Sequence, residues 1–301
     1  MTLRSFLVLL TAALIVLLLL TVWFFPPNED FRAENPFWNG TRDLSSLYAA
    51  RPLESLSGLP PTPQGTTLIL IPYLSFDPGE LAPLESFVTG GGTLVLADDF
   101  GYGNQLLEYL GLPARFANQA ILDPLANHKN RQLPRISRLA PDPLTRDATS
   151  LVLNHATCLL DVAPASVLAS SSSFSFLDRN GNHTRDEDEP TGPLPVISRH
   201  RLGSGQVILV ADPSIVINAM AAMDGNRAFL HNIATTGSLF IDQSHLPPSE
   251  RHQTRNLLAR IRGFLTTPPG TLGLVTVLLA IALRPIWHRK KEDPAEAPPP
   301  L

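Results

Sequence analysis

Two charge-free apolar stretches, one near each end of the chain, most constrain what it can fold into. Ser5 to Phe25 reads SFLVLLTAALIVLLLLTVWFF, and Gly263 to Leu283 reads GFLTTPPGTLGLVTVLLAIAL. A helix of roughly 20 mostly apolar residues spans the hydrocarbon core of a bilayer, and both stretches reach that length. We therefore expect a protein that is held in a membrane at both ends, with one domain between the anchors.

The first stretch is the stronger candidate for a membrane span. It ends in Trp23, Phe24 and Phe25, which suit the interface between the bilayer and water. A cleaved signal peptide is the alternative, but its apolar region would be only about 7–15 residues long and a small-residue cleavage site would follow. The sequence TVWFFPPNED contains no such site. We therefore expect an uncleaved transmembrane helix over residues 5–25.

The second stretch predicts a transmembrane helix over residues 263–287. Pro268 and Pro269 precede its dense apolar part, and proline is tolerated in the first turn of a helix. Trp287 extends the span, and Arg284 would extend its charged end to the lipid headgroups. A buried or interfacial helix is the alternative, because the dense apolar part is short.

Positive charge predicts the orientation of the two spans. Basic residues beside a span tend to stay in the cytoplasm. Arg4 precedes the first span, and four basic residues follow the second: Arg284, Arg289, Lys290 and Lys291. Residues 1–4 and a Pro-rich, disordered tail at 288–301 are therefore expected in the cytoplasm. Residues 26–262 would form one extracytoplasmic domain.

Composition excludes several classes of function. The formal net charge is -4 and no basic stripe occurs, which excludes a nucleic-acid partner. Cys158 is the only cysteine, so the chain forms no intrachain disulfide and no cysteine-based zinc site. The lipid bilayer and other membrane proteins are the expected partners.

Four nearly continuous apolar runs predict strands that are buried on both faces. They read TLILIPY, TLVLADD, QVILVAD and SLFIDQSH, over residues 67–73, 93–99, 206–212 and 238–245. Helix patterns separate them, which indicates right-handed crossovers between parallel strands. The segment PVISRHRLGSGQ predicts a hairpin with the third strand through Gly203 to Gly205. The expected fold class is α/β, an open and mostly parallel sheet with helices on both faces, flanked by two transmembrane helices.

Three segments resemble a known family: LILIPYLSFDPGELAPLESFVTGGGTLVLADDFGYGNQLLEYLG, GQVILVADPSIVINAMAAMDGNRAFLHNI and FIDQSH. They resemble the membrane-anchored domain-of-unknown-function family 4350, over about residues 40–246 and the flanking anchors. The resemblance implies a fold similar to class I glutamine amidotransferases, which is a flavodoxin-like sheet. It also implies proximity to other membrane proteins, including systems linked to a MoxR-type ATPase. A likeness of fold implies no activity.

An amidotransferase would need a cysteine nucleophile on a tight turn between a strand and a helix. Cys158 lies in LNHATCLLDV, without the Gly-x-Cys-x-Gly setting that would expose the sulfur, and His155 is three residues away. We therefore expect a small buried side chain, and we predict no catalytic residues.

Polar residues at and after the strand ends are candidates for a ligand pocket, because open α/β sheets bind ligands beyond the carboxyl ends of their strands. The candidates are Asp98, Asp99, Asn104, Asp212, Asn218, Asn226, Asp242 and His245. Helix capping and turn formation are the alternative, since an aspartate before proline is a typical N-cap.

The segment DRNGNHTRDEDEP resembles the twelve-residue calcium loops of secreted bacterial proteins. The oxygen-bearing residues at positions 1, 3, 5, 7, 9 and 12 are Asp178, Asn180, Asn182, Thr184, Asp186 and Glu189. His183 replaces the glycine at position 6, and no helices flank the loop. A solvated hairpin tip that turns at Asn180-Gly181 is the alternative. Calcium is the one cofactor that this sequence predicts.

Three hypotheses for function follow. The first is a non-catalytic binding or assembly module anchored in the membrane. The second is an extracytoplasmic hydrolase that uses the strand-end carboxylates and His245, with or without a metal ion. The third is an accessory subunit of a membrane export system.

Overall fold

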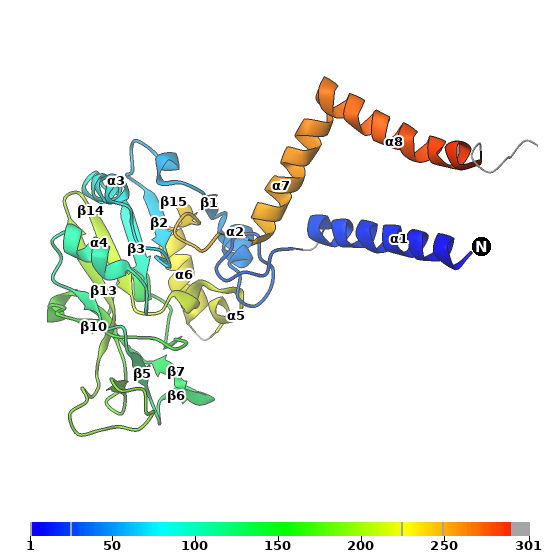
Figure 1. Cartoon of the computed structure of the whole chain (residues 1–301). Helices are drawn as coiled ribbons and strands as arrows, with labels where there is room; N and C mark the ends of the chain where they lie inside the picture. Colours follow the sequence, from blue (N-terminus) through cyan, green and yellow to red (C-terminus); the bar gives the residue numbers. More distant parts are fainter. Residues whose placement is uncertain (1, 25, 224, 249, 290–301) are drawn as a thin grey trace, which may run out of the picture. The chain divides into compact units, whose positions relative to one another are not determined.

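The four apolar runs predicted as parallel strands lie in one eight-stranded sheet (Figure 1). The computed structural model describes residues 2–24, 26–223, 225–248 and 250–289. The sheet order is β1-β15-β2-β3-β14-β13-β11-β8. These strands are β1 (Arg51–Leu53), β2 (Thr66–Leu70), β3 (Thr93–Ala97), β8 (Arg138–Leu139), β11 (Val167–Ser170), β13 (Pro195–Leu202), β14 (Gly205–Val210) and β15 (Ser238–Asp242).

The first five strands of this order are parallel, and the last three are antiparallel to their neighbours. The three central parallel strands, β2, β3 and β14, are buried on both faces: Leu68 and Leu94 point to one face and Ile69 and Val95 to the other, and each is at most 1% exposed. This explains their unbroken apolar sequences, because neither face of such a strand can carry polar side chains. The predicted hairpin through Gly203 is confirmed, as β13 pairs with β14. The fold is therefore a mixed α/β fold around a large sheet.

Helices cover the two faces of the parallel strands. In Figure 1, α3 (Pro78–Thr89) and α4 (Gly103–Tyr109) lie on one side of the sheet, and α6 (Asn226–Ala234) lies on the other. Right-handed crossovers require this arrangement, because the chain moves one way along the sheet from β2 to β14 and back to β15. Short α2 (Arg42–Tyr48) and α5 (Asn218–Ala221) pack against each other.

Two local expectations need correction. The sequence PSIVINAMAAM predicts a helix over 213–223, but the chain forms a 3-10 turn at Pro213–Val216 followed by the four-residue α5, because Ile217 between them adopts an extended conformation. The glycines of DPGELAPLESFVTGGG predict that Gly90 stops α3 in a left-handed conformation, but the φ of Gly90 is -75°, and Gly91 with a φ of 110° makes that turn instead. Gly91 suits it because it has no Cβ.

The loosely patterned segment between residues 113 and 195 forms short antiparallel strands. β4 (Arg115–Phe116) pairs with β10 (Leu159–Leu160), and β5 (Ala120–Leu122) pairs with β12 (Phe176–Asp178). β7 (Asn130–Ile136) pairs with β6 (Asn127–His128) on one side and with β9 (Leu151–Val152) on the other. These strands were too short for the sequence pattern to order.

The chain divides into two compact units, Pro26–Pro247 and the two ends of the chain together, Met1–Phe25 with Pro248–Leu301. The terminal unit contains α1 (Leu3–Phe24), α7 (Glu250–Leu265) and α8 (Pro268–Arg289). Within the described residues, α1 is the one helix that is long and apolar enough by itself to cross a membrane, over Leu3–Thr21 with a mean hydropathy of 2.6.

The second predicted span, 263–287, is not one continuous helix. α7 ends at Leu265 and α8 begins at Pro268, and Leu257–Leu265 with Pro268–Ala280 passes the membrane-span criteria only as a pair bent by 85°. Pro268 and Pro269 explain the break, because a proline offers no N–H to a preceding helical turn and its ring collides with that turn. The disordered tail is predicted from residue 288, but His288 and Arg289 are the last residues of α8; residues 290–301 lie outside the described residues.

Two glycines test this packing. A Cβ on Gly205 would lie 2.2 Å from the carbonyl oxygens of both Val88 and Gly92, whereas a Cβ on Gly79 in α3 would meet nothing within 4 Å. We expect Gly205→Ala to destabilise the sheet domain by about 1–3 kcal/mol through overpacking. Gly79→Ala should stabilise it by up to about 1 kcal/mol, because alanine loses less backbone entropy in a helix. Pulse proteolysis of the full-length protein in urea measures both changes, and equal effects of the two substitutions would contradict the packing described.

Candidate functional site

Three of the predicted pocket residues lie together at the carboxyl ends of neighbouring parallel strands. Asp98 and Asp99 follow β3, and Asp212 follows β14, which pairs with β3 in parallel register. Their charges act on one another, because Asp99 raises the pKa of both Asp98 and Asp212. Tyr73, just after β2, joins this environment: burial first, and then the nearby aspartates, raise its pKa to about 12.

Two of these aspartates hold turns of their own chain. Asp98 accepts hydrogen bonds from the backbone N–H groups of Gly101 and Gly103, at 2.8 and 2.7 Å. Asp212 is the N-cap of the 3-10 turn and accepts from the N–H groups of Ser214 and Asn154, each at 2.7 Å. These contacts are the ones that the capping alternative predicts. They fix the shape of the sheet edge.

The same carboxyl groups are costly to ionise. Burial raises the pKa of Asp98 to about 6 and that of Asp212 to about 7, although their backbone hydrogen bonds act in the opposite direction. Burial also raises the pKa of Asp99, and the N–H of Phe100 and the nearby His155 offset part of that rise. Desolvation disfavours a charged carboxylate, so these groups take up protons at a higher pH than aspartates in water.

The three predicted asparagines hold elements of the fold together. Asn104 of α4 exchanges two hydrogen bonds with the backbone of Phe116. Asn218 of α5 donates to the carbonyl oxygen of Phe37 and accepts from the N–H of Asp43. Asn226 of α6 is completely buried and bonds to both the N–H and the carbonyl oxygen of Val152. In the described part of the chain, these asparagine side chains therefore bond to backbone groups of other elements and not to the strand-end aspartates.

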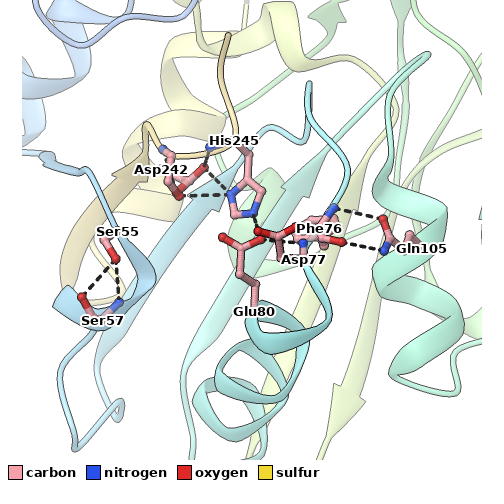
Figure 2. Close-up of polar contacts among 9 residues, drawn as sticks. Ser55, Ser57, Phe76, Asp77, Glu80, Gln105, Asp242 and His245 are labelled. Atoms are coloured by element: carbon pink, nitrogen blue, oxygen red, sulfur yellow. Dashed lines mark hydrogen bonds and ion pairs between the residues drawn. The ribbon is translucent and has the colours of Figure 1, made fainter. Parts of the chain in front are cut away.

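The remaining pair, Asp242 and His245, forms a second cluster at the end of β15 (Figure 2). His245 Nδ1 lies 2.9 Å from Asp242 Oδ2, and its Nε2 lies 3.4 Å from Glu80 Oε2. Glu80 belongs to the first turn of α3, where its Oε2 also accepts the N–H of Asp77 at 2.8 Å. Figure 2 shows the imidazole between the two carboxylates, next to Phe76.

His245 is a positioned group with little access to solvent. Its residue is 2% exposed, and its ring centroid lies 4.6 Å from that of Phe76. Burial lowers the pKa of His245, but Asp242 and Glu80 raise it by more, so the net shift is upward. Asp242 also accepts the Ser244 hydroxyl at 2.6 Å. The cluster joins the end of β15 to the start of α3 by charge.

Cys158 is the small buried side chain expected from the sequence. It is completely inaccessible to solvent, and burial raises the pKa of its thiol to about 12. A thiolate is the reactive form of cysteine, so a thiol with this pKa is a poor nucleophile.

The predicted calcium loop closes on itself directly after β12. The N–H of Leu177 donates to the carbonyl oxygen of Pro190, and the N–H of Arg179 donates to Glu189 Oε1 at 2.8 Å. Asp178 accepts from the N–H groups of Gly181 and His183, at 2.9 and 3.1 Å. Hydrogen bonds within the loop therefore define its conformation.

The central side chains of the loop also meet. Asp186 Oδ2 lies 2.7 Å from Asn180 Nδ2 and 2.9 Å from Asn182 Nδ2. Thr184 donates its N–H to Asn182 Oδ1 at 2.6 Å. His183 has a φ of 60°, the left-handed conformation that glycine adopts at position 6 without strain, so the histidine follows the expected turn at a steric cost.

The donors of this loop suit a hard cation. Ca²⁺ takes oxygen ligands, and an amide oxygen with two lone pairs can accept a backbone N–H and still ligate a metal ion. Among the described residues, no three His, Cys, Asp or Glu side chains form a metal-binding group by themselves. Calcium binding at this loop therefore requires the asparagine amides and backbone carbonyl groups in addition to the carboxylates, and it stays a prediction.

Sequence reasoning missed three features of these sites. Glu80 had a local signal, because Asp77 and Glu80 form a capping box, but nothing in the sequence placed it against His245. Tyr73 was counted within a buried strand. The third feature is a row of solvent-exposed aromatic side chains after β2 and β3, which we name the aromatic edge: Tyr73, Phe100 and Tyr102, with exposed fractions of 42%, 51% and 49%.

The buried groups predict a pH dependence of stability. Asp98, Asp212 and His245 each bind a proton more tightly in the folded state than in the unfolded chain, so stability falls as pH rises through their raised pKa values. The apparent melting temperature of the full-length protein should be higher at pH 5 than at pH 8. Asp212→Asn should make this fall shallower, whereas Asp43→Asn, at an exposed carboxylate, should leave it unchanged. Equal slopes in all three proteins would contradict the buried-carboxylate interpretation.

The loop predicts weak calcium binding, with a dissociation constant of roughly 10⁻⁴–10⁻³ M, as is typical of extracellular loops. Asp186→Ala should weaken it about tenfold or more, because Asp186 is at ligand position 9 and meets Asn180 and Asn182. Asp188→Ala removes an exposed carboxylate at a non-ligand position of the same loop and is the matched control. Isothermal titration with CaCl₂ measures both variants; no heat of binding in the unsubstituted protein would leave the loop as a solvated hairpin tip.

Comparisons with known proteins identify the family to which the chain belongs. Comparison with curated proteins found no match. The mmIFT52 N-terminal domain is 17% identical, with 57% of this chain and 78% of that chain covered and a TM-score of 0.44. A β-galactosidase from Bacillus circulans sp. alkalophilus is 20% identical, with a TM-score of 0.35; the match covers 56% of this chain and 22% of that chain. Both TM-scores lie below 0.5.

The family model described as Domain of unknown function (DUF4350) matches residues 33–234. This range contains most of the sheet domain, including β2, β3, β14 and the predicted calcium loop, and ends at the last residue of α6. It confirms the family that the first two sequence segments resemble, while the third, FIDQSH, lies beyond the matched range. The chain belongs to the DUF4350 family of domains of unknown function.

Proposed function

We propose that this protein is a membrane-anchored, non-catalytic module whose sheet domain binds or assembles with another membrane protein outside the cytoplasm. The observation that carries the proposal is that the polar groups at the strand ends bind the backbone of neighbouring loops. Asp98 and Asp212 hold backbone N–H groups of their own loops, so they shape the sheet edge. The geometry favours a shaped surface over a reactive centre.

The aromatic edge is where we place the partner. Tyr73 follows β2, and Phe100 and Tyr102 follow β3; the N–H of Tyr102 donates to the carbonyl oxygen of Pro72, so the two loops are in contact. Tyrosine and other aromatic side chains often carry most of the binding energy in protein interfaces.

Membrane attachment is part of the same proposal. α1 is an apolar helix of 22 residues, and the bent pair α7 and α8 would supply the second attachment. With both ends of the chain cytoplasmic, as the basic residues flanking the spans indicate, the sheet domain would face outward. Two attachments limit the rotation and reach of the domain, so it would meet proteins of the same membrane at high effective concentration. The resemblance to class I amidotransferases enters only as a fold hypothesis.

A hydrolase is the second candidate, and the Asp242–His245 pair is the observation that favours it. A carboxylate that accepts from one imidazole nitrogen and orients the ring is the arrangement of a general base. Here, however, the second nitrogen of His245 faces Glu80, and the residue is only 2% exposed. A substrate would reach His245 only after α3 or the loop after β15 moved.

Crosslinking in the native membrane, followed by purification of the full-length protein in detergent, tests the proposal. We expect a stoichiometric membrane protein to copurify, and the identity of that protein distinguishes an export system from a MoxR-linked one. A clean, partnerless protein that hydrolyses ester or phosphoester substrates would overturn the proposal in favour of the hydrolase.

A double substitution of the aromatic edge, Phe100→Ser with Tyr102→Ser, should lower recovery of the partner roughly tenfold, because hot-spot side chains typically cost more than about 1 kcal/mol each. Phe174→Ser is the matched control, since Phe174 is 60% exposed and belongs to the segment before β12. Quantitative mass spectrometry of the crosslinked complexes measures recovery. Equal losses in the two variants would place the partner elsewhere.

A further inference from the structure

A surface hollow of about 570 Å³ lies between the β6–β7 hairpin and the predicted calcium loop. Two basic side chains line it, Lys129 and Arg131, together with the imidazole of His183. Three amide side chains complete its polar wall: Asn127, Asn130 and Gln132. The lining residues that the structure describes include no aspartate or glutamate, although acidic residues outnumber basic ones in the chain, 27 to 23.

The backbone turn at Lys129 and a side-chain hydrogen bond of Arg131 place these two residues at the hollow. Lys129 is the tip of the hairpin between His128 and Asn130, which pair across it, and its φ is 74°. Lysine adopts this left-handed conformation at a cost that glycine does not incur, and such outliers gather at binding sites. Arg131 Nη1 donates to the carbonyl oxygen of His183 at 2.6 Å, which holds the guanidinium beside the loop.

The donors that remain in this wall suit an oxyanion. A guanidinium has five N–H donors in a planar fork, so one bond to His183 leaves capacity for a ligand. His183 Nδ1 lies 3.4 Å from Asp178 Oδ2, which turns the opposite edge of the ring away from that carboxylate. A phosphate group has close to two negative charges at neutral pH and three strong acceptor oxygens, which matches two cations and several amide N–H groups.

From these observations we propose that the hollow is a binding site for a phosphate group, carried by a small phosphate ester or by a phospholipid headgroup. The volume is in the range of small-molecule sites, which is roughly 300–1,000 Å³. Among the described lining residues there is no Phe, Tyr or Trp side chain, the larger aromatic surfaces on which bases stack. The site is separate from the aromatic edge, and neither proposal depends on the other.

The test uses the full-length protein in an uncharged detergent, with EGTA present so that calcium in the neighbouring loop plays no part. Inorganic phosphate and sn-glycerol 3-phosphate are titrated at constant ionic strength, and the broadening of their ³¹P resonances reports binding. Constant ionic strength separates binding from general screening. We expect saturable broadening, and none for either probe would overturn the proposal.

Two variants and a control locate the site. Lys129→Gly removes one charge at a φ that glycine accepts freely, so the hairpin should keep its fold. Arg131→Gln removes the fork, and each variant should weaken phosphate binding about tenfold, as expected for one charge-assisted hydrogen bond. Arg201→Gln, at an exposed position of β13, should bind phosphate like the unsubstituted protein. Equal weakening in all three variants would indicate a diffuse electrostatic effect and would overturn the site.

A final arm distinguishes the two sources of the phosphate. Phosphatidylglycerol is doped into the detergent micelles during the titration. Displacement of glycerol phosphate at a lower concentration of the lipid than of free phosphate assigns the site to a headgroup. The opposite order assigns it to a soluble ester. Both results support a phosphate site, and the loss of saturable binding in Lys129→Gly is required in either case.

Discussion

Burial of both faces of the parallel strands is the constraint on which the rest of this structure depends. β2, β3 and β14 can be continuously apolar only because α3 and α4 cover one face and α6 covers the other. The same burial extends to the residues at the strand ends. Burial therefore removes Asp98 and Asp212 from water. This desolvation is the largest cause of their raised pKa values.

Backbone N–H groups are the means by which the fold tolerates these buried acids. Asp98 and Asp212 each accept two, and Asp242 accepts the N–H of His245 besides its imidazole. Carboxylates used in this way position loops, and the loops in turn present the aromatic edge to solvent. Stability, local shape and the proposed binding surface thus have one physical origin, the burial of the strand ends. The proposed phosphate site lies outside this scheme, in the antiparallel segment.

Much of the parallel half of the fold was predictable. Each of the four apolar runs forms a strand, because a sequence that is apolar on both faces has no other stable place in a domain of this size. The family was also recognisable from local segments, as the match over residues 33–234 confirms. The second membrane span was predicted as one helix, but Pro268 and Pro269 divide it into α7 and α8 with a bend of 85°. The apolar character of the segment led to the prediction of one helix. The two prolines have no backbone N–H to donate, and for this reason the helix is interrupted there.

The sequence by itself determined the apolar N-terminal helix, the strand positions, the hairpin through Gly203 and the order of oxygen-bearing residues in the loop from Asp178 to Glu189. These features depend on neighbours along the chain, through hydrophobic periodicity and turn chemistry. Only the tertiary structure decided that Glu80 faces His245, that Asn226 bonds to Val152, and that Arg131 reaches the carbonyl oxygen of His183. Each pair is distant in sequence, and its contact is set by how sheet, helices and short strands pack, which no local pattern records.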